Sequence, residues 1–130
     1  MAKLTTTINK GEITAICADA ISELERAVRS KPEFPGDFSM YEKAGAKELL
    51  KAFREMNDGG KARATTVFEE EYYEFLEMAL AGNRKWARIE LVQAMAMLLR
   101  IYCHFDSYVS ETNKAITQSG NNAILQEVQP

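Results

Sequence analysis

Two short runs of oxygen-bearing side chains lie on either side of Gly82 and could together bind a metal ion. Before the glycine, Glu71 and Glu74 interrupt an apolar stripe that has the spacing of one helix face. After it, Glu90 and Gln93 interrupt a second stripe in the same way. Side-chain oxygens suit a hard cation such as Mg²⁺ or Mn²⁺, which takes the rest of its shell from water and substrate phosphate. The two runs therefore indicate a divalent-cation site.

The two runs are spaced symmetrically about the glycine. Glu74 and Glu90 each lie eight residues from Gly82. Glu71 and Gln93 each lie eleven residues from the same glycine. Because every helical residue rises about 1.5 Å, an antiparallel hairpin would place the two members of each pair at equal height. Three carboxylates and a carboxamide would then share a partly dehydrated space, and the repulsion between the carboxylates favours a bound cation.

An ordinary surface helix is the alternative explanation for the four glutamates in 69–74, because glutamate is a common helix former. The mirrored second stripe and its apolar flanks favour the metal site.

Two further residues are candidates for phosphate chemistry. Glu70 lies one position off the stripe and could orient an attacking water, or simply be solvated. Arg100 lies one turn beyond Met97 on the second stripe and is a candidate ligand of the substrate phosphate.

The two runs resemble the signature of a known enzyme family. EEYYE at 70–74 and ELVQ at 90–93 are similar to the EExxE and ExxD motifs of the MazG-like nucleotide pyrophosphohydrolases, and the gap between them also fits. The resemblance covers roughly residues 57–105. It implies a MazG-like all-α fold that forms a homodimer or homotetramer. It also implies hydrolysis of a nucleoside triphosphate to a nucleoside monophosphate and pyrophosphate.

The same resemblance assigns roles to individual residues. It makes Glu71, Glu74 and Glu90 ligands of the metal ion, and it puts Gln93 where the commoner motif has aspartate. The amide oxygen of a glutamine can bind Mg²⁺, but the site then carries one negative charge fewer than a site with aspartate at this position. The alternative function is a helical oligomerisation or interaction protein that retains the fold and has impaired catalysis.

Helical periodicity predicts the elements that carry these residues. Residues 11–29 place apolar side chains at three- and four-residue spacings, which predicts an amphipathic helix. Two prolines and a glycine in 31–37 predict a turn. Ser39 and Glu42 have the spacing of a capping box and open a second helix, which should end at 57–60.

The third and fourth helices carry the candidate site. Thr66 and Glu69 repeat the capping-box spacing, which predicts a helix over 66–81 that could begin one turn earlier. Residues 84–109 contain neither proline nor glycine and predict one long core helix, which 111–118 extends or follows as a short helix. These elements predict an all-α bundle of four to five helices.

Composition and charge exclude several classes of function. The chain has 130 residues, of which 46% are hydrophobic and 27% charged, and a net charge of −3. This composition predicts one globular domain over 1–118 with a flexible tail over 119–130. The negative charge argues against binding to nucleic acid or to an anionic membrane. Two cysteines, with no apolar run of membrane-spanning length, predict a reduced, cytoplasmic protein without a signal peptide.

Overall fold

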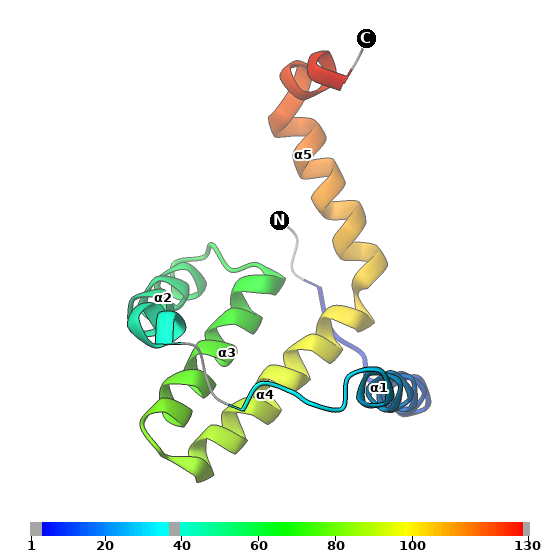
Figure 1. The fold of residues 1–130 in the computed structure, drawn as a ribbon. Coiled ribbons are helices and arrows are strands. Elements are labelled where there is room, and N and C mark those ends of the chain that lie inside the picture. The colour runs from blue at the N-terminus through cyan, green and yellow to red at the C-terminus, as the bar shows by residue number, and fades with distance from the viewer. Residues whose placement is uncertain (1–3, 37–39, 129–130) are drawn as a thin grey trace. The chain divides into compact units, whose positions relative to one another are not determined.

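The computed structural model describes residues 4–36 and 40–128, and within them the only regular elements are helices. The all-α prediction is therefore confirmed for the described part of the chain. Thr7–Leu99 forms one compact unit, and the described residues before and after it form another. Figure 1 shows the five helices, which are α1 (Lys10–Ser30), α2 (Met40–Asp58), α3 (Ala64–Leu80), α4 (Arg84–Cys103) and α5 (Phe105–Val128).

The first two helices begin and end close to their predicted positions. The periodicity over 11–29 corresponds to α1, which begins after Asn9, whose side chain accepts a hydrogen bond from the backbone N–H of Glu12. α2 ends at Asp58, as the glycines that follow it predicted. The capping box predicted at the start of α2 lies outside the residues whose side chains are described. None of the described helices combines the length and the apolar character needed to cross a bilayer.

α2 and α3 pack closely against each other in the first unit. Within the described part of the chain they run antiparallel, because a short turn joins them. Leu50 of α2 and Leu76 of α3 are fully buried. The rings of Phe53 and Tyr73 stack across the same interface with their centroids 5.7 Å apart. This packing fixes the face that α3 turns toward α2, and so fixes where the glutamates of α3 lie.

Two adjacent leucines of α2 provide a matched test of this core. Leu50 is 1% exposed and Leu49 is 40% exposed. Replacing Leu50 with alanine should lower the free energy of unfolding by about 2–5 kcal/mol, since the lost methyl groups leave a cavity. Leu49→Ala should lower it by about 1 kcal/mol or less. Urea denaturation followed by circular dichroism measures both values, and equal losses would contradict the placement of α2.

The turn between α2 and α3 is held by a side-chain network that the sequence did not predict. α3 begins at Ala64, so Thr66 lies inside its first turn and is not the cap expected there. The Thr66 hydroxyl accepts from the backbone N–H of Arg63 at 2.8 Å and lies 2.8 Å from Asn57 Oδ1. The Asn57 amide in turn donates to the Thr66 carbonyl at 3.2 Å. Asn57 therefore ties the end of α2 to the start of α3.

Gly82 reverses the chain between the two helices that carry the candidate site. Its φ of 77° lies in the left-handed region, which glycine adopts without the clash that a Cβ would cause. The N–H of Gly82 donates to Ala79 and that of Asn83 donates to Met78, which is the Schellman pattern that ends a helix. Asn83 Oδ1 then accepts from the N–H of Trp86 and caps α4. The predicted end of α3 at this glycine is confirmed.

The long helix predicted over 84–109 is wrong in one respect, because it divides at His104. α4 ends at Cys103 and α5 begins at Phe105. The backbone N–H of His104 donates to the carbonyl of Ile101, three residues back, and its ring lies 2.8 Å from the Thr6 hydroxyl. α5 continues to Val128, through residues expected to form a tail, while the prediction of a single domain over 1–118 stays a prediction.

Candidate metal centre

Three carboxylates converge between α3 and α4. Glu71 and Glu74 come from α3 and Glu90 from α4, and each offers an oxygen that lies within 4.8 Å of the other two. All three side chains are half-buried. The equal spacing about Gly82 predicted this meeting, because two antiparallel helices that rise equally from one turn bring equally distant residues to the same height. These three glutamates are called the carboxylate cluster below.

Gln93 completes the cluster on the α4 side. Its side-chain amide lies 2.9 Å from Glu71 Oε2 and 2.8 Å from Glu90 Oε2, and with its nitrogen turned inward it donates to both. A half-turn about the last side-chain bond would present the amide oxygen to the same space instead. Gln93 can therefore either bridge two carboxylates or supply an oxygen ligand to a cation between them.

The carboxylates affect each other's protonation. Desolvation, followed by the neighbouring Glu74 and Glu71, raises the pKa of Glu90 to about 7. Burial and then the charges of Glu74 and Glu70 also raise the pKa of Glu71, whereas hydrogen bonding to Glu90 and the Arg54 charge oppose that rise. Without a cation, the cluster therefore lowers its charge by retaining a proton near neutral pH. A divalent cation would offset the same repulsion more strongly.

Arg54 is a charged residue of this region that the sequence analysis missed. Its Nη2 donates to Glu74 Oε1 at 3.1 Å, so a guanidinium from α2 lies at the edge of the cluster. No motif joins α2 to the two runs of the site. Arg54 lies four residues after Leu50, on the helix face that packs toward α3, and this spacing is the feature of the sequence that indicates its position.

The two remaining candidates lie in different surroundings. Glu70 Oε1 accepts a hydrogen bond from the Asn57 amide at 3.3 Å, and its charge raises the pKa of the adjacent Glu71. Glu70 is thus held beside the cluster without belonging to it. Arg100 belongs to the second unit, where its Nε donates to the Thr6 hydroxyl at 3.3 Å. Its role as a phosphate ligand stays a prediction.

The ligand set determines which ion the cluster could hold. Carboxylate and amide oxygens are hard ligands that suit Mg²⁺ or Mn²⁺, whereas zinc and copper sites in proteins are rich in histidine and cysteine. Of the described residues, the group close enough to share an ion consists of glutamates alone. Such an ion would leave coordination positions open, since Mg²⁺ takes about six ligands and usually keeps several waters. Substrate phosphate oxygens could occupy those positions.

Comparisons of the chain with protein-family models, with curated proteins and with solved structures give no match. The function therefore has to be inferred from the carboxylate cluster, its neighbours and the motif in which they occur.

Proposed function

We propose that the protein is a nucleoside triphosphate pyrophosphohydrolase that depends on Mg²⁺ or Mn²⁺ and converts an NTP or dNTP and water to the monophosphate and pyrophosphate. The observation that carries the proposal is the convergence of Glu71, Glu74 and Glu90 at one place. Gln93 lies against two of them. These are the four positions that the MazG-like motif assigns to the metal. Desolvation and then the neighbouring carboxylates raise the pKa of Glu90, and a cation would stabilise the charged cluster against both effects.

The residues of the cluster have separate roles in the proposed reaction. The ion would be held by Glu71, Glu74, Glu90 and the Gln93 amide oxygen, and it would neutralise phosphate oxygens and make a water more acidic. Glu70, fixed by Asn57, orients the attacking water and accepts its proton. The water oxygen forms a bond to the α-phosphorus while the bond between that phosphorus and the α,β-bridging oxygen breaks. Pyrophosphate leaves with the bonding electron pair.

A direct assay tests this function. Purified protein is incubated with Mg²⁺ and a panel of ribo- and deoxyribonucleoside triphosphates, and pyrophosphate and monophosphate are measured. We expect both products in equal amounts from at least one nucleotide, and none when EDTA removes the metal. Release of orthophosphate without pyrophosphate would point to a different reaction. Absence of any product across the panel would count against the proposal.

Exposed apolar side chains support the further proposal that the protein is a homo-oligomer. α1 has no buried residue, and Leu24 on its apolar face is 62% exposed. On α4, the stripe formed by Leu91, Met95 and Leu98 is also exposed, with Met95 at 57%. A helix that is apolar on several faces normally packs against protein on those faces. A second copy of the chain would cover these surfaces, and the motif resemblance implies a dimer or tetramer.

A charge placed on the α4 stripe tests this assembly. Met95→Glu should convert the wild-type oligomer to a smaller species, because a carboxylate buried in an apolar interface loses its hydration without gaining a partner. Size-exclusion chromatography with light scattering measures the mass. Thr65→Glu adds the same charge at an exposed position of α3 and should leave the mass unchanged. A monomeric wild-type protein would refute the proposed assembly.

One observation favours a second candidate function, an interaction protein of the same fold with impaired catalysis. The Gln93 amide can donate to Glu71 and Glu90 together, so the cluster has an internal donor where the family motif has another carboxylate. The effect of Mg²⁺ or Mn²⁺ on the melting temperature separates the two functions. A ligand present at a hundredfold excess over its Kd stabilises the native state by about 2.7 kcal/mol. Melting that is independent of metal would favour the interaction protein.

A further inference from the structure

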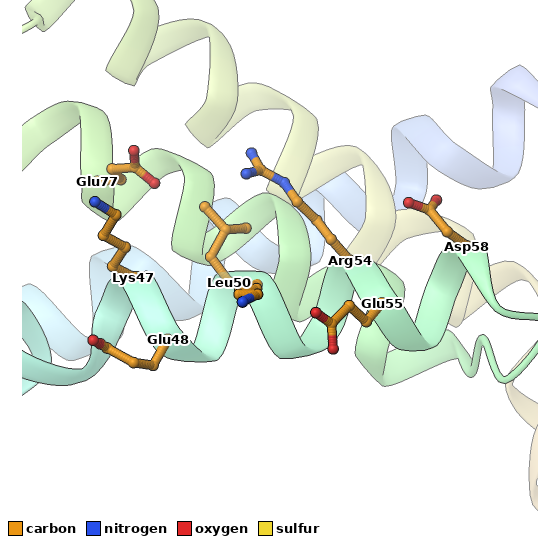
Figure 2. Close-up of a pocket in the computed structure, with 8 residues that line it drawn as sticks. Lys47, Glu48, Leu50, Arg54, Glu55, Asp58 and Glu77 are labelled. Atoms are coloured by element: carbon orange, nitrogen blue, oxygen red, sulfur yellow. The ribbon is translucent and has the colours of Figure 1, made fainter.

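Arg54 has one hydrogen-bond partner among the described residues, and most of its donors remain available. A guanidinium carries about five N–H donors arranged in a plane, and Arg54 uses one of them on Glu74. The side chain is 51% exposed, so its other donors can reach a ligand that approaches from solvent. Figure 2 shows Arg54 on the same side of α2 as Leu50, with Glu48 and Glu55 on the other side.

The charge of Arg54 is applied directly to the carboxylate cluster. Its guanidinium pairs with Glu74 at 3.1 Å, so it offsets charge on one of the two carboxylates that α3 contributes. A divalent cation in the cluster would offset the charge of Glu74 in place of Arg54. The ion pair between Arg54 and Glu74 would then be weaker. The guanidinium would lie at the edge of a cation site, where phosphate oxygens bound to the cation would project.

The pocket that Arg54 helps to line does not itself select phosphate. It contains the basic residues Lys47, Lys51 and Arg54 together with four acidic side chains, so its summed charge is negative. Of the three basic residues, Arg54 is the one paired with the carboxylate cluster. The capacity to bind phosphate beside a cation therefore rests on Arg54 and not on the basic residues of α2 in general.

We propose that Arg54 is a ligand of the substrate triphosphate, and that it exchanges its bond with Glu74 for phosphate oxygens when the metal and the nucleotide bind. This inference rests on the proposed function of the cluster. Arginine suits the role because its planar donors match two phosphate oxygens at once, which a lysine ammonium does not. The exchange also keeps the charge of Glu74 offset both before and after the metal binds.

The test measures metal binding and nucleotide binding separately in three variants. Isothermal titration gives the Kd of Mn²⁺ for the nucleotide-free protein. It then gives, in saturating Mg²⁺, the Kd of the α,β-methylene analogue of a nucleotide that the wild-type protein hydrolyses. For Arg54→Gln we expect unchanged or tighter Mn²⁺ binding, since a competing cation is removed. We expect nucleotide binding to weaken by roughly ten- to a hundredfold, the usual effect of losing a charge-assisted pair.

Two companion variants make the result specific. Arg54→Lys keeps the charge but loses the paired geometry, and its nucleotide Kd should lie between those of wild type and Arg54→Gln. Lys51 lines the same pocket less than one turn away on α2, and Lys51→Gln removes one positive charge there. Because Arg54 is the basic residue of this pocket that pairs with the cluster, Lys51→Gln should change neither Kd.

Each remaining outcome overturns the inference. If Arg54→Gln binds Mn²⁺ and nucleotide as wild type does, Arg54 is not a phosphate ligand. If the variant loses both affinities and melts at a lower temperature, Arg54 is a brace between α2 and α3. A wild-type protein that neither binds Mn²⁺ nor hydrolyses any nucleotide would instead refute the proposed function, and with it this inference.

Discussion

Replacing Glu90 with glutamine is expected to abolish stabilisation of the protein by Mg²⁺ and to lower pyrophosphate release by more than about a hundredfold. Residues that merely orient metal ligands already change affinity or activity by about 10- to 100-fold, and Glu90 would be a ligand itself. It is the carboxylate that α4 contributes to the cluster, so its loss leaves the ion with charged ligands from one helix. Thermal melting with and without Mg²⁺, together with the pyrophosphate assay, measures both effects.

The same variant should be more stable than wild type when no metal is present. In the folded protein the pKa of Glu90 is about 7, whereas the ordinary value is 4.5. The folded chain therefore keeps a proton that the unfolded chain releases between these values. The free energy of unfolding of metal-free wild type should fall as the pH rises through this window and level off above it. The glutamine of Glu90→Gln stays neutral, so the free energy of unfolding of this variant should depend less on pH. The dependence that remains comes from Glu71, whose pKa is also raised by burial.

Denaturation in EDTA from about pH 5 to about pH 8 measures these curves. Glu69→Gln serves as the matched control, because it removes the same charge from α3 outside the cluster. We expect the control to follow wild type both in the pH curve and in its response to Mg²⁺. A Glu90→Gln variant with wild-type pH dependence would show that the pKa of Glu90 is not raised in the folded protein, and the metal-site proposal would lose its physical basis.

The meeting of the site residues could be predicted because it depends on quantities that are local in the sequence. A helix has a fixed rise and a fixed angular repeat, and Gly82 marks where two helices reverse. Counting from that glycine is enough to pair Glu74 with Glu90, and no knowledge of the remaining chain is needed. The end of α3 follows from the same glycine, since a left-handed residue is needed there.

The features that could not be predicted depend on packing between distant segments. Arg54 joins the cluster because α2 packs on α3 with Leu50 inward, and that register is set by tertiary contacts. The break at His104 has no proline or glycine to mark it, and its ring is held by Thr6, almost a hundred residues away in sequence. Thr66 looked like a helix cap because its spacing to Glu69 is right. α3 instead begins two residues earlier, at Ala64, and the Thr66 hydroxyl donates to Asn57 from within its first turn.

Gln93→Asp should change the stability of the protein in opposite directions with and without metal. With its nitrogen turned inward in the metal-free cluster, the Gln93 amide donates to Glu71 at 2.9 Å and to Glu90 at 2.8 Å. An aspartate loses both donors and adds a fourth carboxylate to the cluster, so we expect the metal-free variant to lose on the order of 2 kcal/mol at neutral pH. With Mg²⁺ bound, the added charge attracts the cation, and the metal Kd should fall by about tenfold or more.

Gln93→Asn separates charge from length in this experiment. Asparagine has the shape of aspartate but carries no charge, so it should lose the two hydrogen bonds without gaining metal affinity. Titration with Mn²⁺ and melting in EDTA distinguish the three proteins. If aspartate and asparagine behave alike in both measurements, charge at this position has no effect and Gln93 lies outside any cation site. If aspartate alone tightens metal binding and raises pyrophosphate release, the glutamine is what limits the wild-type protein, because it allows the carboxylates to coexist without the ion.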